Sequence, residues 1–141
     1  MSEQNKAIVR RLFDAFNAGR FDDAVSLLGS DYVWRGPGAE ARGRDGWKQV
    51  AKTYRDAYPD LTMTIDEQIA DGDVVVTRFT ARGTHRGALA GVAASGRAVT
   101  VPCVVMTRIV NGRIAEDREY FDQLGMFQQI GMLPSLNAVT V

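Results

Sequence analysis

The stretch VTVPCVVMTRIVNGRIAEDREYFD, residues 99–122, carries the clearest structural pattern in this chain. On both sides of Asn111-Gly112, apolar and β-branched residues alternate with polar ones in the manner typical of β-strands. Asn-Gly is strongly favoured in tight hairpin turns, because both turn positions can require a positive φ. The sequence therefore predicts two long antiparallel strands, 99–110 and 113–122.

The rest of the chain changes from helical to extended periodicity at Pro59. Before this residue, apolar side chains recur at helical spacing or form one short strand, in the ranges 3–18, 21–28, 31–35 and 43–58. After it, extended runs and a last amphipathic stretch occupy the ranges 61–65, 74–81, 99–122 and 123–130. Helices grouped before strands predict an α+β fold. We expect one domain, residues 1–141, with N-terminal helices packed on a strongly curved mixed or antiparallel sheet around a pocket.

The composition excludes several classes of function. Lys and Arg together number 17, as do Asp and Glu, so the net charge of zero and the lack of a basic cluster argue against a nucleic-acid partner. A single cysteine and a single histidine argue against a disulfide, a metal site and a metal cofactor. Without an apolar signal core or a membrane-length run, we expect a cytoplasmic protein with no membrane partner.

Four consecutive charges, Glu116-Asp117-Arg118-Glu119, lie inside the second hairpin strand. Because side chains alternate between the two faces of a strand, one face carries Glu116 with Arg118 and the other carries Asp117 with Glu119. If a helical layer covers one face, a pair of these charges points into the interior. The register of the hairpin decides which pair that is.

Two registers are open for the hairpin. A two-residue turn pairs Val104 with Glu119, whereas a three-residue loop ending at Gly112, with a bulge, places Glu119 beside Cys103 and Val105. We favour the second register, because it puts Asp117 and Glu119 on an otherwise apolar face. There, lost hydration and the neighbouring carboxylate raise the pKa of a carboxyl group, which suits a general base or acid. The alternative is a set of cross-strand ion pairs on the surface without a functional role.

The residues from Met106 to Asp122, with 129–131, resemble the SnoaL-like polyketide cyclases, which belong to the superfamily shaped like nuclear transport factor 2. Residues 8–20 and 83–87 are similar too, so that the resemblance covers most of residues 5–131. It implies a cone-shaped fold whose concave sheet face holds a ligand, and a homodimer formed through the outer face of the sheet.

The resemblance also implies roles for individual residues. In the cyclases, an aspartate on the last long strand is the acid and base of an intramolecular aldol closure, and its position matches Glu119. A histidine on the preceding strand matches Val105 here. Residues 118–122 also resemble the limonene-epoxide hydrolases, in which a carboxylate activates water beside an arginine and a second carboxylate. Those three positions match Glu119, Arg78 and Thr80.

We therefore expect a cofactor-independent enzyme that acts on an apolar, polyketide-like molecule by cyclase or isomerase chemistry. In this enzyme Glu119 would carry protons, and Asp117 and Arg78 would adjust its pKa. The alternatives are an epoxide-hydrolase-like enzyme, a non-catalytic binding or accessory protein, and a structural dimer module. Arg78 can equally form a structural ion pair, and a lone histidine such as His85 is more often structural than functional. The residues expected to contact the substrate are Trp34, Tyr54, Phe79, His85, Cys103, Val105 and Phe121.

Overall fold

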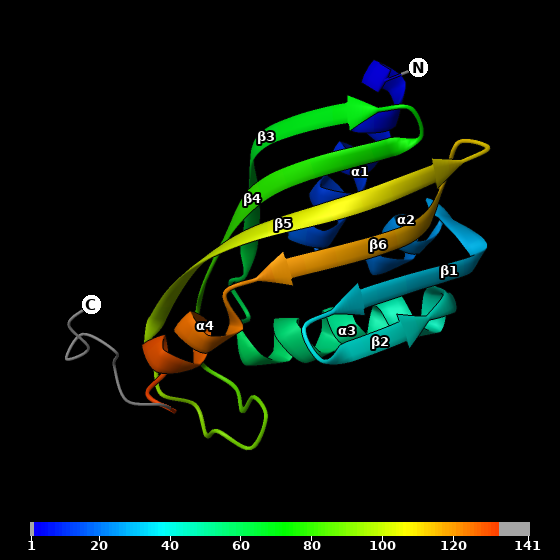
Figure 1. Cartoon of the computed structure of the whole chain (residues 1–141). Coiled ribbons are helices and arrows are strands. Elements are labelled where there is room, and N and C mark those ends of the chain that lie inside the picture. The colour runs from blue at the N-terminus through cyan, green and yellow to red at the C-terminus, as the bar shows by residue number, and fades with distance from the viewer. Residues whose placement is uncertain (1, 133–141) are drawn as a thin grey trace.

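A computed structural model describes residues 2–132 of the chain. Four helices and six strands follow one another in an order that places most helical residues before the long strands (Figure 1). The elements are α1 (Ser2–Asn17), α2 (Phe21–Val25), β1 (Leu28–Gly36), β2 (Ala39–Arg42), α3 (Gly43–Ala57), β3 (Thr62–Asp71), β4 (Val74–Thr84), β5 (Ala98–Val110), β6 (Arg113–Phe121) and α4 (Gln123–Gln129).

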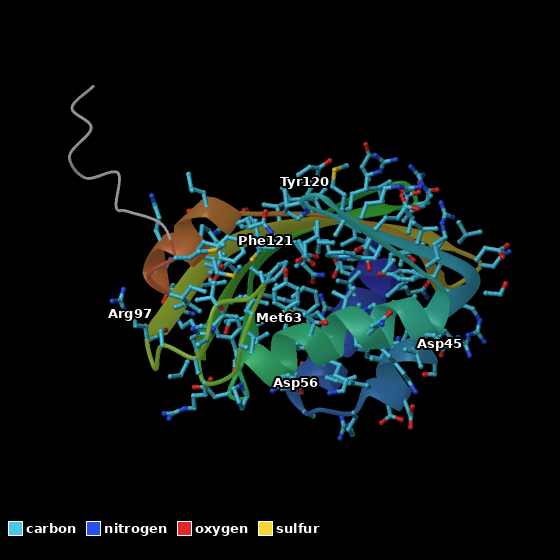
Figure 2. The ribbon with its side chains drawn as sticks, turned by 90° about the horizontal axis from the view of Figure 1, so that it is seen from below. Asp45, Asp56, Met63, Arg97, Tyr120 and Phe121 are labelled. Atoms are coloured by element: carbon cyan, nitrogen blue, oxygen red, sulfur yellow. The ribbon has the colours of Figure 1, made fainter. Side chains whose placement is uncertain are left out.

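The strands form one six-stranded sheet in the order β2-β1-β6-β5-β4-β3. All neighbouring strands are antiparallel except β1 and β6, which pair in parallel. The sheet is therefore mixed, and it stays open between its edge strands β2 and β3. In Figure 2 the sheet is the upper layer and α3 runs beneath it, with side chains filling the space between. The predicted α+β fold, with helices packed on a curved sheet, is confirmed.

Three elements differ from those predicted from the sequence. The short edge strand β2 was not expected, and the predicted helix 21–28 ends at Val25 because Leu28 already belongs to β1. The strand predicted over 61–65 continues as far as Asp71. Its pairing with β4 shifts between Ile65 and Glu67, so Asp66 is an extra residue that interrupts the alternation.

The hairpin between β5 and β6 has a two-residue turn, Asn111 and Gly112, with φ values of 52° and 75°. Next to the turn Ile109 pairs with Ile114, but the register then shifts, and Ala115 is left as a bulge. Beyond the bulge Thr107 pairs with Asp117 and Val105 with Glu119. The register favoured for the two carboxylates is confirmed. The three-residue loop expected to cause it is wrong, because the shift arises two residues inside β6.

The hydrophobic core lies between the concave face of the sheet and the helices. The ring of Phe13 from α1 meets Phe79 from β4 edge to face, with 4.8 Å between the ring centroids. Burying each such side chain contributes about 1.5–3 kcal/mol to stability. Phe121 points into this interior, whereas its neighbour in β6, Tyr120, points away from it (Figure 2). Within residues 2–132, none of the helices has the length and apolar character needed to span a bilayer.

Candidate active site

A pocket lies between the concave face of the sheet and the helices α1, α3 and α4. Its volume is about 130 Å³, far more than the roughly 10–15 Å³ that one water molecule requires. Most of the wall is apolar, and several aromatic side chains contribute to it: Phe13, Phe16, Trp34, Trp47, Phe79 and Phe121. Asp117 and Glu119 are the two carboxylates on the wall. The arrangement suits an apolar organic ligand that meets acid–base groups at one place.

Asp117 is held by two hydroxyl groups from neighbouring strands. Its side chain is buried, with 4% of the residue's surface exposed. Tyr32 of β1 donates a hydrogen bond of 2.6 Å to one carboxyl oxygen, and Thr107 of β5 donates one of 2.6 Å to the other. Burial raises the pKa of Asp117, and the two hydrogen bonds oppose that rise. Because both carboxyl oxygens accept a hydrogen bond, Asp117 is fixed in position and is less suited than Glu119 to carry a proton to a ligand.

Glu119 lies two residues further along β6, on the same face, and is partly buried. Burial raises the pKa of its carboxyl group to about 7, and the charge of Asp117 pushes in the same direction. A hydrogen bond from the side chain of Trp34 opposes the rise. No cation contributes to the shift. Near neutral pH both the carboxylate and the acid are populated, which is the condition for a group that first accepts and then returns a proton.

Two further groups on the pocket wall are influenced by Glu119. The pKa of Tyr54 on α3 is raised to about 12, first by burial and then by the charge of Glu119. The pKa of the Cys103 thiol is likewise raised to about 12 by burial and by Glu119. Tyr54 therefore stays a protonated hydrogen-bond donor. Cys103 stays a thiol, which makes it a poor nucleophile.

The structure brings most of the predicted site residues together. Eight of them line the pocket: Trp34, Tyr54, Phe79, Cys103, Val105, Asp117, Glu119 and Phe121. Their roles in binding or catalysis stay predictions.

Arg78 is not in the pocket. Its side chain is 57% exposed on the outer face of β4 and forms ion pairs of 3.7 Å with Asp66 and 3.5 Å with Glu67. Thr80 also points outward and donates a hydrogen bond to Asp66. The reason is strand alternation: Phe79 faces the pocket, so both of its neighbours must face away. The expectation that Arg78 tunes the carboxylates is wrong on these grounds.

His85 is fully buried but is not among the residues that line the pocket. Its Nδ1 atom lies 2.9 Å from the hydroxyl of Ser95 and accepts a hydrogen bond of 3.1 Å from the Ser95 backbone N–H. Its ring contacts that of Tyr58, with 5.7 Å between the centroids. His85 therefore contacts a residue of the pocket wall, Tyr58, but does not line the pocket itself as expected of a substrate contact.

The contacts that Tyr32, Thr107 and Tyr58 make at the site were not predicted from the sequence. Thr107 follows from the favoured register, in which it lies directly opposite Asp117. Tyr32 precedes Trp34 by two residues and so shares its strand face, but its contact with Asp117 depends on the parallel pairing of β1 with β6. In the described part of the chain, no three His, Cys, Asp or Glu side chains come together in a way that could hold a metal ion.

Replacing Trp34 by Phe should raise the pKa of Glu119 above about 7, because the hydrogen bond that favours its ionised form is lost. In a profile of kcat/KM against pH, the rise that reports the free carboxylate should move to higher pH by about one unit. Trp47→Phe is the matched control, because Trp47 lines the same pocket but does not influence the pKa of Glu119. An unchanged profile in Trp34→Phe would show that the indole does not control Glu119.

Known proteins share the sequence pattern and the fold of this chain. Residues 6–130 match the sequence pattern of the SnoaL-like polyketide cyclases. An aklanonic acid methyl ester cyclase of Streptomyces peucetius is 29% identical over 88% of both chains, and one of Streptomyces sp. strain C5 is 30% identical over 88% of this chain and 80% of its own. The crystal structure of IdmH from Streptomyces antibioticus is 33% identical and superimposes with a TM-score of 0.81, over 91% of this chain and 99% of its own. The chain belongs to the SnoaL-like polyketide cyclase family.

Proposed function

We propose that this protein catalyses an intramolecular aldol-type ring closure of a polyketide-like ester, with Glu119 as the general base and then the general acid. The observation that carries the proposal is a carboxyl group with a pKa of about 7 on the wall of an apolar pocket. The names of the relatives support the substrate class, because they are cyclases of aklanonic acid methyl ester and nogalonic acid methyl ester.

The reaction needs one group that moves a proton twice. The carboxylate of Glu119 removes a proton from a carbon next to a carbonyl group, and the resulting carbanion attacks a second carbonyl carbon of the same molecule. A carbon–carbon bond forms, and the attacked carbonyl becomes an alkoxide. The protonated Glu119 then gives its proton to this alkoxide. The product is an isomer of the substrate, so no oxidant, reductant or leaving group enters the balance.

The surrounding residues support each part of this cycle. The side chain of Trp34 orients Glu119 through its hydrogen bond, and the charge of Asp117 helps to hold the pKa near neutrality. The protonated hydroxyl of Tyr54 is available to a developing negative charge on a substrate oxygen. The apolar wall excludes water from the carbanion and holds the two reacting carbons of one molecule close together.

The epoxide-hydrolase alternative receives no support. It needs an arginine and a second carboxylate beside the base, and the residues at those positions, Arg78 and Thr80, lie on the outer face of the sheet.

A cytoplasmic location and a homodimer stay predictions from the sequence.

The proposal is tested by incubating the protein with aklanonic acid methyl ester or nogalonic acid methyl ester and separating the products by chromatography with mass detection. We expect a product of unchanged mass. Because the carboxylate is the active form, kcat/KM should rise with pH up to about 7 and then level off. Tight binding of both esters without conversion at any pH would instead identify a binding protein.

A further inference from the structure

A second polar group lines the same pocket, at the C-terminal end of α3. Tyr58 lines the pocket with only 1% of its surface exposed, and its hydroxyl has no hydrogen-bond partner among residues 2–132. Buried hydroxyls are nearly always paired, since an unpaired one costs about 1–3 kcal/mol. A hydroxyl left unpaired on a ligand-pocket wall points to a partner that the ligand supplies.

His85, whose ring contacts that of Tyr58, also has a buried polar atom without a hydrogen-bond partner among the described residues. Nδ1 of His85 accepts a hydrogen bond from the backbone N–H of Ser95, which can only donate. In a neutral imidazole the proton is then on Nε2. This atom is buried and has no partner among the described residues, while the ring contacts Tyr58. Nε2–H can only donate, whereas a phenol oxygen can accept one proton and donate its own.

Tyr58 is far from the reacting carboxylate. A side chain on Gly83 would meet Cβ of Tyr58 at 3.0 Å, and Gly83 pairs with Val99. Glu119 pairs with Val105, six residues further along β5, which corresponds to about 20 Å of strand. Tyr54 lies between the two, since its pKa is influenced by both Glu119 and Tyr58. The pocket thus has one polar end at Glu119, another at Tyr58, and a mostly apolar wall between them.

We propose that Tyr58 is a specificity-determining residue whose hydroxyl donates a hydrogen bond to a carbonyl oxygen at the end of the ligand remote from the reacting carbons, and that Nε2–H of His85 donates to the Tyr58 oxygen once this ligand is bound. The pairing satisfies both unpaired groups at once. It implies that the pocket binds an elongated ligand with acceptor oxygens at both ends. The inference rests on the proposed function for the reaction at Glu119, but the binding it describes needs no reaction.

The test uses two probes that differ only in one acceptor, 2-acetylanthracene and 2-isopropenylanthracene, and measures their dissociation constants by fluorescence at pH 8.5. At this pH Glu119 is mainly a carboxylate and cannot donate to the ketone. The wild type should bind the ketone about fivefold more tightly than the alkene, as one neutral hydrogen bond allows. In Tyr58→Phe this preference should vanish. Tyr120→Phe, the same change on the exposed outer face of β6, should retain it.

Two further measurements separate a binding role from a structural one. Removing an unpaired buried hydroxyl should leave the melting temperature of ligand-free Tyr58→Phe equal to or above that of the wild type. Because His85 is the single histidine of the chain, its ring nitrogen signals can be read directly by ¹⁵N NMR. The Nε2 signal should move when the ketone binds to the wild type, but not in Tyr58→Phe.

Retention of the ketone preference in Tyr58→Phe, or its loss in Tyr120→Phe as well, would overturn the proposal. So would a melting temperature that falls by several degrees in Tyr58→Phe, because the hydroxyl would then have a structural partner. If the Nε2 signal does not move when the ketone binds, His85 is not part of the proposed subsite. None of these readouts depends on turnover, so a failed ring-closure assay leaves the test of this subsite intact.

Discussion

Replacing Glu119 by Gln is expected to lower kcat by about 10³-fold, because a positioned acid–base group contributes about 10²–10⁴-fold and an amide cannot take or return the proton. The change keeps the size of the side chain, so the pocket and the binding of the substrate should be preserved. The measurement is kcat and KM on the ester that the wild type converts. Full activity in Glu119→Gln would refute the proposed mechanism.

Glu116→Gln is the matched control for this variant. Glu116 lies on the same strand but on the opposite face of the sheet, where it forms ion pairs with Arg118 and Arg35. The control makes the same chemical change three residues away without touching the pocket, and surface ion pairs contribute only about 0–1 kcal/mol to stability. Its kcat should stay close to that of the wild type. An equal loss in both variants would point to general damage to β6.

Glu119→Gln should also make the protein more stable above neutral pH. The pKa of Glu119 is raised on folding, from 4.5 to about 7, so the folded protein binds this proton more tightly than the unfolded chain. The resulting stability is present below about pH 4.5 and is lost as the pH rises through 7. The variant has no such loss. Its free energy of unfolding should exceed that of the wild type by about 2 kcal/mol at pH 8, after allowance for solvent in the pocket, and by much less at pH 5.

This stability difference is measured by denaturant unfolding at the two pH values, with Glu116→Gln alongside. A gain of equal size at pH 5 and pH 8 would mean that the ionisation of Glu119 is not its cause.

The second large effect is expected at Asp117, where the result depends on the replacement. Asp117→Ala leaves the hydroxyls of Tyr32 and Thr107 without their acceptor in a buried place, and it creates a small cavity. We expect a loss of about 3–4 kcal/mol in the free energy of unfolding. Asp117→Asn should lose much less, because both hydroxyls can turn to accept from the amide or donate to its oxygen.

Asp117→Asn also separates the electrostatic role of this residue from its structural one. Removing the neighbouring negative charge should lower the pKa of Glu119, so that the rise in kcat/KM moves to lower pH. The variant is therefore measured twice, by unfolding and by its pH profile. A folded Asp117→Asn variant with the wild-type profile would show that Asp117 only supports the structure.

The sequence favoured Asp117 and Glu119 on the inner face, because they alternate in phase with apolar residues of the neighbouring strand, but it left a second register open. It did not reveal how the register arises. A three-residue loop and a bulge at Ala115 give the same pairing for Glu119, and no local pattern distinguishes them. The error at Arg78 was avoidable, because the same strand had already assigned Phe79 to the interior.

Other parts of the site depend on contacts that no local pattern reports. Tyr32 reaches Asp117 across 85 residues of sequence, through the parallel pairing of β1 with β6. Strand β2 is four residues long, and its alternating alanines and charges lack the β-branched residues that mark a strand. The continuation of β3 was hidden by Asp66, whose extra position breaks the alternation on which the prediction relied.

The bulge at Ala115 divides the hairpin into two parts with opposite phase. Residues between the turn and the bulge follow one assignment of faces, and those from Glu116 onward follow the other. A hairpin tip lengthened by one residue in each strand would leave the carboxylates facing the ligand. Loss of Ala115 would remove the bulge and still leave Arg108 opposite Glu116 and Thr107 opposite Asp117. Gain of one residue between Glu116 and Asp117, with the pairing nearer the turn unchanged, would instead place Asp117 opposite Met106 and turn both carboxylates outward. Across related chains, the stretch between the bulge and the carboxylates should therefore keep its length, a restriction that no catalytic residue imposes by itself.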